Sequence, residues 1–432
     1  MLPRIMRSDR KPLQPTLRVD NVEPAERSLR ILLLSQYFSP EVGATQSRMQ
    51  AFAEHLAARG HQVTVICEFP NHPHGVIPPE YRGHFYEDDR SNPYRILRVW
   101  VKASEEKTQR TRMHFYLSYM ALATAMAPVA GKADVVVATT PPLFTGAAGL
   151  ALARLNRAPF VLDVRDLWPS AAVSLDQIPS KTAIRASELL ERTLYRQATA
   201  VTAVTQPFCD HIDATRGREP HTVLVPNGTL DLFFEEVDSL DARERLGVRD
   251  GHALVTFAGT LGIAQALPSV LDAACLSGDD IRWAFVGDGP MRERLLHGAK
   301  KRELTNVHFH PQVSLDEVPP LLAASDILLV TLAAHPTFAD FVPSKLVDFM
   351  ATGKPVLLSA AGESARLLEA AGGGIAVAPE DPQALVDAAR WLVAHPEEAA
   401  DMGRRGRAFA RSRLRSVQAA RLEQLLLELA RR

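Results

Sequence analysis

Short runs of β-branched and apolar residues alternate with longer amphipathic stretches along most of this chain. The first series of strands is predicted over residues 31–35, 62–68, 96–101, 134–139, 160–163, 200–205 and 222–225. The second is predicted over residues 254–258, 283–286, 307–309, 327–331, 356–359 and 375–377. Apolar strands that alternate with helical patterns are typical of parallel sheets covered by helices on both faces. The pattern therefore predicts an α/β protein with two doubly wound sheets.

The two series of strands define two domains. We predict an N-terminal Rossmann-like domain over residues 29–232 and a C-terminal one over residues 233–415. The amphipathic segment 416–432 is expected to form a helix that returns to the first domain. Residues 1–28 mix Arg, Pro, Asp and Glu without periodicity, so we predict a mobile N-terminal extension.

The arrangement of two such sheets indicates where to look for function. Ligands of open α/β sheets bind beyond the carboxyl ends of the strands, and two facing sheets would enclose an interdomain cleft. No GxGxxG motif follows the first strand, which disfavours a dinucleotide-dependent dehydrogenase.

Charge and cysteine content narrow the classes of partner. The chain has 49 Lys plus Arg against 50 Asp plus Glu, so no net field favours nucleic acid. The three cysteines lack CxxC spacing, which argues against a disulfide framework or a zinc site and favours a reducing cytoplasm. No His/Cys cluster has metal-ligand spacing, and we expect no metal.

One long apolar stretch covers residues 113–130. It contains a histidine, two tyrosines and Pro128, so we do not predict a transmembrane helix. Lys107, Arg110, Arg112 and His114 begin this region. Two interpretations stay open: a helix that docks on anionic lipid, and a buried Rossmann helix with a basic start.

Two loops of the first half carry candidate site residues. Gly43 precedes a predicted helix, where unpaired backbone N–H groups can bind an anion, although a structural turn accounts for it equally well. Arg165 and Asp166 follow the fifth strand beside an aromatic residue. We favour an active-site loop over a simple ion pair, because functional residues concentrate on such loops.

Two loops of the second half join a strand to a helix through glycines. Residues 259–265 contain Gly259 and Gly262, which suits a phosphate-binding loop. Gly287 and Asp288 form a second glycine-containing loop after the next strand. A structural turn that binds no ligand is the alternative interpretation there.

Residues 340–355 contain two charges that a helix by itself does not favour. Ser344 is predicted to cap this helix. Lys345 lies in the first turn, where the helix dipole disfavours a cation, so a phosphate explains it better. Asp348 stands among apolar neighbours, where a carboxylate is costly unless a ligand such as a pair of sugar hydroxyls binds it.

Together and in this order, these motifs resemble family 4 of the retaining glycosyltransferases, which have the GT-B architecture of two facing Rossmann-like domains. Within that family the chain is similar to the branch that builds bacterial surface polysaccharides such as colanic acid and O-antigen. The resemblance extends from Arg30 to the C-terminus and rests on residues 35–44, 165–169, 225–228, 259–265, 287–290 and 343–355. It implies that the first domain binds the acceptor and the second the donor.

The resemblance also assigns roles to residues. The family's paired acids fall on Asp340 and Asp348, although glutamates are usual there. Asp348 would bind the ribose hydroxyls and Asp340 would face the donor sugar. Many relatives have a catalytic histidine after the fifth strand, where this chain has Asp166.

The same resemblance implies how the diphosphate is bound. Many relatives carry a basic pair after the first glycine of the second domain, where this chain has Thr260 and Gln265, so Lys345 would make more of the diphosphate contact. The implied catalytic residues are Asp166, Asp340 and Lys345. The implied donor-binding residues are Gly43, Gly259, Thr260, Gln265, Gly287, Asp288, Ser344, Lys345 and Asp348.

The predicted activity is a metal-independent transfer of a sugar, with retention, from a nucleoside diphosphate sugar, by resemblance UDP-linked. No cofactor is expected, since the nucleotide sugar is a substrate. The expected acceptor is a glycan or a polyprenyl-linked sugar, at the cytoplasmic face of the inner membrane. A sugar-nucleotide 2-epimerase and a non-catalytic nucleotide-sugar binding subunit stay open as alternatives.

Overall fold

A computed structural model describes residues 4–7, 23–72, 74–106, 108–174, 180–219, 221–248 and 251–431. The chain divides into two compact units. The first unit is Met1–Pro226 with Arg415–Arg432, and the second unit is Asn227–Leu414. The chain thus enters the second unit after Pro226, slightly before the expected boundary at residue 232.

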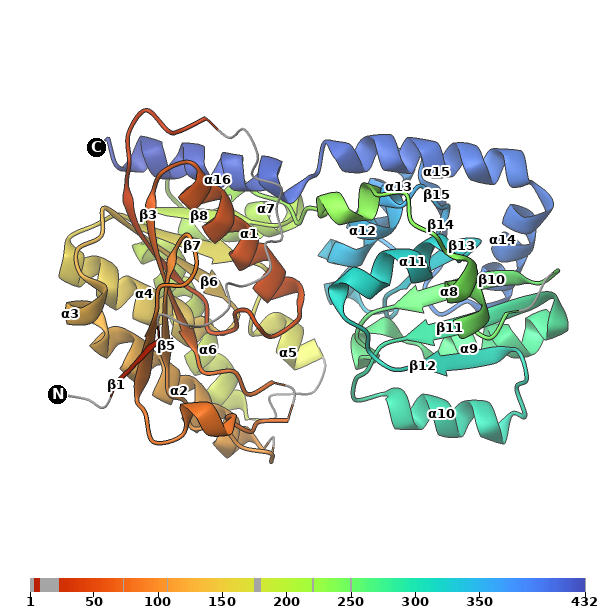
Figure 1. Cartoon of the computed structure of the whole chain (residues 1–432), viewed down its shortest axis with the longest axis horizontal. Helices are drawn as coiled ribbons and strands as arrows, with labels where there is room; N and C mark the ends of the chain where they lie inside the picture. Colours follow the sequence, from red (N-terminus) through yellow and green to blue (C-terminus); the bar gives the residue numbers. More distant parts are fainter. Residues whose placement is uncertain are drawn as a thin grey trace. The chain divides into compact units, whose positions relative to one another are not determined.

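The first unit is built on a twisted sheet that, among the described residues, has nine strands in the order β1–β4–β5–β3–β2–β6–β7–β8–β9 (Figure 1). The strands are β1 (Arg4–Arg7), β2 (Arg30–Leu34), β3 (Gln62–Glu68), β4 (Tyr86–Asp89), β5 (Arg95–Val99), β6 (Val135–Thr140), β7 (Phe160–Val164), β8 (Ala200–Ala203) and β9 (Val223–Leu224). Neighbouring strands are parallel except β4 and β5. The predicted α/β class is confirmed for this unit.

Helices cover both faces of this sheet. They are α1 (Ala44–Ala58), α2 (Gln109–Ala125), α3 (Ala127–Ala130), α4 (Leu143–Asn156), α5 (Ser170–Ser174), α6 (Lys181–Gln197), α7 (Gln206–Arg216) and α16 (Arg415–Leu429). The strands of the sheet centre are buried along their whole length, as continuous apolar strands between two helical layers should be.

Strand β4 was not predicted, because three consecutive acids resemble a loop rather than a strand. In the structure all of them are buried, and arginines on the neighbouring strand bind them. Arg98 Nη1 lies 3.1 Å from Asp89 Oδ2, and Arg95 Nε lies 2.8 Å from Asp88 Oδ1. The cross-strand ion pairs make an acidic strand tolerable inside the sheet.

Within residues 1–28, predicted as a mobile extension, the structure describes residues 4–7 and 23–28, and several of these are hydrogen-bonded to the first unit. Arg4–Arg7 form β1, which pairs with β4 through the backbone and so needs no periodic side-chain pattern. Ala25 N donates to Arg59 O at 2.8 Å, and Ser28 Oγ donates to Gly60 O at 2.7 Å. Residues 1–3 and 8–22 lie outside the described residues.

Helix α16 packs against α1, as Figure 1 shows for the two helices of the first unit. Glu423 on α16 is buried and lies 2.9 Å from His55 Nε2, 2.8 Å from Arg59 Nε and 3.2 Å from His61 Nε2. Leu29 N donates to His61 Nδ1 at 3.1 Å, so the His61 proton lies on Nε2 and points at the carboxylate. The Glu423 carboxylate therefore links α16 to α1 and to the start of β3.

The second unit contains a parallel sheet of six strands among its described residues, in the order β12–β11–β10–β13–β14–β15. The strands are β10 (Ala253–Ala258), β11 (Ile281–Val286), β12 (Val307–His310), β13 (Ile327–Thr331), β14 (Val356–Ser359) and β15 (Gly374–Val377). The predicted strands of this half are all present. Phe257, Trp283 and Phe285 belong to its core.

Helices flank this second sheet as well. They are α8 (Leu240–Arg245), α9 (Pro268–Ser277), α10 (Arg292–Lys301), α11 (Val318–Ala323), α12 (Ser344–Ala351), α13 (Glu363–Ala371), α14 (Pro382–Ala394) and α15 (Pro396–Arg411). Short 3-10 turns, η3 (Ile263–Gln265) and η6 (Pro336–Asp340), follow β10 and β13.

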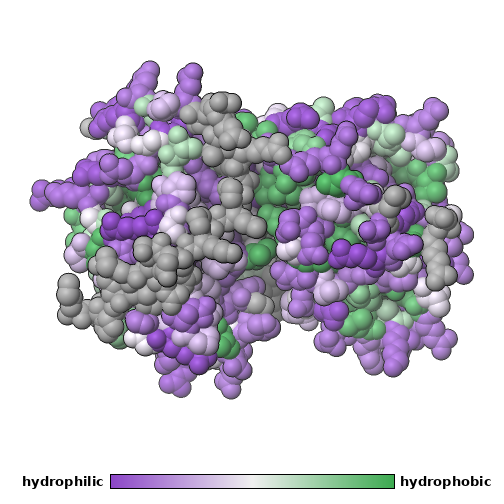
Figure 2. Space-filling model, in the orientation of Figure 1, coloured by the Kyte–Doolittle hydropathy of each residue, from purple (hydrophilic) through white to green (hydrophobic). Residues whose placement is uncertain are grey.

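The outer surface is mixed in polarity. On the face shown in Figure 2 hydrophilic residues predominate, and hydrophobic ones form scattered patches. None of the described helices has both the length and the apolar composition that crossing a bilayer requires.

Candidate functional site

Two loops at the carboxyl ends of β10 and β11 are joined by backbone hydrogen bonds. Gly259 N donates to Val286 O at 2.9 Å, and Leu261 N donates to Asp288 O at 2.8 Å. Met291 N donates a hydrogen bond to Leu261 O at 2.9 Å. The two glycine loops predicted from the sequence thus form one rigid rim at the edge of the sheet where ligands of such folds bind.

Glycine is required at two points of this rim. Gly287 has φ +141°, and a Cβ there would overlap the Gly259 carbonyl oxygen. Gly289 has φ +155°, and its Cβ would lie 2.5 Å from Leu261 O. Only a residue without Cβ lets the two loops approach so closely.

We expect Gly287→Ala to destabilise the second unit by about 2–4 kcal/mol, because both its φ and the neighbouring backbone exclude a side chain. Calorimetric thermal unfolding of the full chain measures this loss. Gly43→Ala is the matched control, since φ at Gly43 is 170°, which any residue adopts, and its Cβ would meet only the movable end of Gln46. Equal effects of the two substitutions would contradict the argument.

Lys345 lies beside the glycine rim. Its Nζ lies 3.7 Å from the centre of the Phe257 ring, and a Cβ built on Gly259 would stand 2.6 Å from that Nζ. The ammonium is buried and has no hydrogen-bond acceptor in the described chain. Burial lowers the pKa of Lys345 to about 7, against the attraction of Asp348. The site thus contains a buried amino group that no acceptor in the described chain binds directly.

The N-cap residue of helix α12, which carries Lys345, differs from the predicted one. Pro343, not Ser344, occupies the N-cap position, and Ser344 is the first helical residue. The predicted capping role of Ser344 is therefore wrong, because Pro343 already has the extended backbone that ends the preceding segment. The N–H groups of Ser344 and Lys345 have no acceptor in the described chain, as expected for a first helical turn.

Four other predicted residues of the second unit, three of them on the rim loops, differ in exposure and in hydrogen-bond partners. Thr260 is exposed, and the main-chain carbonyl oxygen of Gln265 accepts from Thr331 Oγ1 at 2.6 Å. Asp288 Oδ1 accepts from Gly289 N at 2.7 Å, so this carboxylate shapes its own turn. Asp340 ends η6 and is half-buried, with no hydrogen-bond or ion-pair partner in the described chain.

Two predicted residues, Gly43 and Asp166, belong to the first unit. Gly43 is the N-cap residue of α1. Asp166 follows β7 and is half-buried; burial raises the pKa of Asp166, against the opposing effect of the Arg165 charge. They are thus at the carboxyl ends of β2 and β7, apart in sequence from the residues on α12.

Arg165 fixes the loop that carries Asp166. Its Nε donates to Thr139 Oγ1 at 2.8 Å, its Nη2 donates to Pro141 O at 2.6 Å, and its Nη1 contacts Thr45 Oγ1. The guanidinium thus connects β6, β7 and α1 rather than serving only as an ion pair for Asp166. The arrangement favours a rigid loop around the carboxylate.

A buried ion pair beneath this loop escaped sequence analysis. Arg48 on α1 donates to both oxygens of Asp163, at 2.8 and 3.2 Å, and neither side chain is accessible to solvent to a significant degree. Thr139 and Thr202 donate to the same carboxylate at 3.0 and 2.8 Å. Arg48 also binds the carbonyl of Pro226, where the first unit ends.

Sequence analysis also missed Phe257, the ring under Lys345. Its position two residues before Gly259 gives a hint, but an aromatic residue inside a strand is ordinarily part of the core. In the described parts of the chain, no three His, Cys, Asp or Glu side chains are grouped so that they could hold a metal ion.

Comparison with known families gives two matches that follow one another along the chain. The family described as "Glycosyl transferase 4-like domain" matches residues 43–228, and "Glycosyl transferases group 1" matches residues 238–409. The Escherichia coli (strain K12) protein described as "Putative colanic acid biosynthesis glycosyl transferase WcaI" is 26% identical over 85% of this chain and 93% of its own. The D-rhamnosyltransferase WbpZ of Pseudomonas aeruginosa is 34% identical over 38% of this chain and 42% of its own.

Solved structures match the fold. Anabaena Alr3699/HepE in complex with UDP and glucose has a TM-score of 0.69 and 20% identity, over 93% of this chain and 99% of its own. WaaG, a glycosyltransferase of lipopolysaccharide biosynthesis, has a TM-score of 0.68 and 18% identity, over 92% of this chain and 99% of its own.

Proposed function

This chain belongs to the family-4 glycosyltransferases with the GT-B fold, and from that premise we propose that it transfers a sugar from a nucleoside diphosphate sugar, UDP-linked, to a glycan or polyprenyl-linked acceptor of a surface polysaccharide. The buried, unpartnered ammonium of Lys345 beside the glycine rim carries this proposal. The UDP complexes of similar folds support the choice of base.

The donor diphosphate is the anion that this cation lacks. Lys345 Nζ and the unpaired N–H groups of Ser344 and Lys345 would bind its oxygens. Asp348, one turn further along α12, would accept from the ribose hydroxyls, and Asp340 would face the donor sugar. The rim residues Gly259, Thr260, Gly287 and Asp288 would contact the phosphates or the sugar, and Gln265 and Gly43 would complete the donor contacts.

The transfer we propose keeps the anomeric configuration. The bond from the anomeric carbon to the diphosphate oxygen breaks, and the diphosphate leaves with the electron pair. The acceptor oxygen bonds to the same face, and its proton passes to the departing phosphate oxygen. Lys345 would stabilise the leaving charge without a metal or a cofactor, and Asp166 would contact the reacting sugar from the first unit. Undiminished turnover in EDTA is the expected result.

The donor site is tested with Asp348→Ala. Calorimetry and thermal shift with UDP, GDP and their sugars should show which of them stabilises the wild type, and binding of that nucleotide should be about 10- to 100-fold weaker in the variant, because hydrogen bonds from two ribose hydroxyls to a carboxylate are lost. Asp387→Ala, an exposed carboxylate on α14, is the control. If the wild type binds none of these nucleotides, the proposed donor site is wrong.

The same protein preparation separates the alternatives. Conversion of the donor sugar without an acceptor would identify a 2-epimerase. Binding without turnover on a wide set of acceptors would identify a nucleotide-sugar binding subunit.

We further propose that α2 docks on anionic lipid at the cytoplasmic face of the inner membrane. Arg110, Met113 and Leu117 share one face of this helix, and Met113 and Leu117 are 42% and 38% exposed. Lys107, part of the predicted basic start, lies outside the described residues. The exposed face favours the lipid-docking alternative over a fully buried helix, since only Tyr119 and Ala123 among the described residues of α2 are buried.

Vesicle co-sedimentation tests this docking. Met113→Ser/Leu117→Ser should reduce binding to phosphatidylglycerol vesicles by about 30-fold, because each of the two exposed apolar side chains contributes about 1 kcal/mol of burial. Leu189→Ser, on α6 and 68% exposed, should leave it unchanged. Equal binding of all three proteins would remove α2 from the proposal.

A further inference from the structure

Asn71, which follows β3 in the first unit, is held in one orientation by its neighbours. Its backbone N donates to Glu41 Oε1 at 2.7 Å. Its Nδ2 donates to Glu68 Oε1 at 2.7 Å and to Phe69 O at 3.0 Å. Both partners of Nδ2 are acceptors, so the amide cannot be reversed, and Oδ1 is left without a donor in the described chain.

The orientation of the Asn71 amide is the same whether or not Glu68 is protonated. Glu68 is buried and also accepts from Gln36 Nε2 at 2.8 Å. Burial, together with the nearby charge of Glu41, raises the pKa of Glu68. When Glu68 is protonated, Gln36 can reverse its amide, because Gln36 Oε1 has no other partner in the described chain. Phe69 O still holds Asn71 Nδ2, so Asn71 Oδ1 stays available to a ligand.

Asn71 lines a cavity of about 290 Å³ whose wall contains three aromatic rings, those of Tyr37, Phe115 and Tyr116, beside polar residues. Tyr37, from the loop after β2, lies 6.5 Å from Phe115 of α2, centre to centre, and Phe115 lies 5.6 Å from Tyr116. Aromatic faces with a few fixed polar groups are the usual lining of a small-molecule site. Asn71 is 8% exposed, so its amide is held at the wall of the cavity rather than on the open surface.

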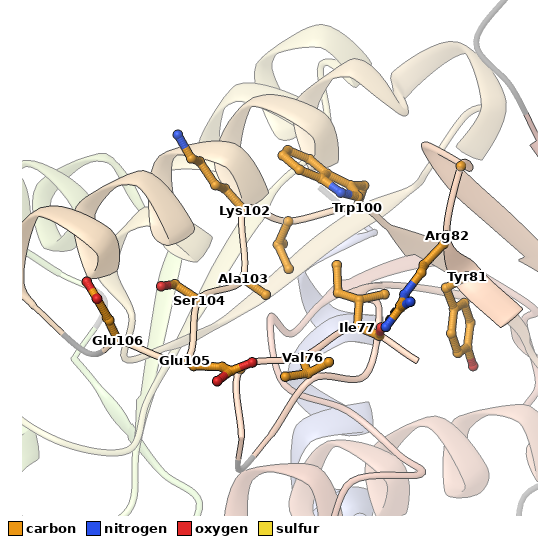
Figure 3. A pocket seen from close by; sticks show the side chains of 13 residues that line it. Val76, Ile77, Tyr81, Arg82, Trp100, Lys102, Ala103, Ser104, Glu105 and Glu106 are labelled. Carbon is orange, nitrogen blue, oxygen red and sulfur yellow. Dashed lines mark hydrogen bonds between the residues drawn. The ribbon is translucent and has the colours of Figure 1, made fainter. Parts of the chain in front are cut away.

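A larger cavity, of about 660 Å³, adjoins the first one, because both are lined by Gly75, Ser104 and Glu106. Figure 3 shows it between Trp100 and Lys102 on one side and Ile77 and Arg82 on the other. Gly75 has φ +73°, and a Cβ there would overlap Ser104 O. A glycine thus allows the two loops that separate the cavities to meet.

The charges around the two cavities nearly cancel. Their described lining contains the cations Arg82, Lys102 and Arg112 and the carboxylates Glu105 and Glu106. A polyanion would gain little from this balance. A pyranose fits the lining better, because its C–H face packs on aromatic rings and its hydroxyls can donate to a fixed oxygen.

We propose that the two adjoining cavities are the acceptor site of this enzyme and take a neutral hexose-containing glycan, with one sugar hydroxyl donating to Asn71 Oδ1 and one ring packed on Trp100. This inference rests on the proposed glycosyltransferase activity. It adds to that activity the chemical class of the acceptor and the residues that select it. Glu41 and Glu68 are positioning residues, since they act through Asn71.

The test is a binding screen of the full chain with neutral disaccharides and trisaccharides of glucose, galactose and mannose, alongside matched uronic acid glycans. Ligand-observed NMR and tryptophan fluorescence report binding. Asn71→Ala and Trp100→Ala should weaken binding of the neutral glycans at least about 10-fold, the loss of one good hydrogen bond or one stacked ring. Trp391→Ala, on α14 of the second unit and 38% exposed, is the matched aromatic control.

Binding of UDP, measured on the same variants, separates the two proposals. UDP binding that persists while neutral glycans bind equally to wild type, Asn71→Ala and Trp100→Ala would overturn the acceptor site. A preference for the uronic acid glycans, or no glycan binding at all, would overturn it too. If the wild type binds no UDP, the proposed donor site is wrong. The glycan measurements then still decide the acceptor site: weaker binding in Asn71→Ala and Trp100→Ala supports it, and equal binding overturns it.

Discussion

Lys345→Met is expected to have opposite effects on nucleotide binding and on the stability of the free protein. Binding of UDP should weaken about 30- to 150-fold, because about 2–3 kcal/mol of charge-assisted hydrogen bonding to the diphosphate is lost. The free variant should be more stable by roughly 1–3 kcal/mol, since a buried ammonium without an acceptor is replaced by an apolar chain that can pack on Phe257.

The pH dependence gives the same proposal a second readout. Burial lowers the pKa of Lys345 to about 7, whereas the unfolded chain keeps the ordinary value. Between these two values the unfolded state binds a proton that the folded state does not, so the wild type gains stability as pH rises above 7. The advantage of Lys345→Met should therefore shrink over this range, as urea unfolding at pH 6 and pH 9 can show.

Donor binding should respond to pH in the opposite sense. The diphosphate favours the charged lysine, so UDP affinity of the wild type should fall as pH rises through about 7. Lys345→Arg keeps its charge throughout and should lose this dependence. Lys354→Met, also half-buried in the second unit but outside the site, is the control for UDP binding. Unchanged UDP binding in Lys345→Met would refute the role of the lysine.

Arg48→Met should be the most damaging single change in the first unit, at about 3–5 kcal/mol of unfolding free energy. The substitution leaves the Asp163 carboxylate buried with only two threonine hydroxyls as partners. It also removes the bonds from Arg48 to Val225 O and Pro226 O. Chemical denaturation followed by circular dichroism measures the loss.

A double variant and a pH series isolate the uncompensated charge. Arg48→Met/Asp163→Asn should recover at least about half of the lost stability, because no charge is then buried without a partner. In the wild type, burial opposes ionisation of Asp163, but Arg48 attracts the carboxylate and holds its pKa below the usual value. That stabilisation is present at neutral pH and is lost in acid.

Without Arg48, burial raises the Asp163 pKa above its unfolded value. The difference in stability between Arg48→Met and wild type should then narrow as pH falls from 7 toward 4. A difference that is constant with pH would mean that lost packing, and not charge, explains the effect.

The glycine rim and the unusual position of Lys345 were predictable because their signals are local. Lys345 and Asp348 stand out against the helix that contains them, and Gly259 and Gly287 are needed by the backbone at their own positions. A single sequence displays such conflicts between a residue and its expected element. The Ser344 cap failed for a related reason, since Pro343 fulfils the same local requirement one residue earlier.

Residues that act through distant partners were not predictable. In the sequence Asn71 is an ordinary loop residue, and only the structure shows that Glu41 and Glu68 orient it. Phe257 likewise has the pattern of a core residue, and only the structure shows Lys345 over its ring. Nothing in the vicinity of Arg48 in the sequence indicates its partner, 115 positions away. Such contacts depend on how strands and helices are ordered in the sheet.

By itself, then, the sequence determined the α/β class, the two series of strands and the positions of the rim glycines and of Lys345, because periodicity and backbone requirements are properties of short segments. Only the tertiary structure decided that the acidic strand β4 is buried and that Glu423 joins α16 to α1 by an ion pair. It also decided that Asn71 lines a cavity together with Tyr37, Phe115 and Tyr116. In each of these cases the partners are far apart in the chain, and burial decides what a charge or an amide can do.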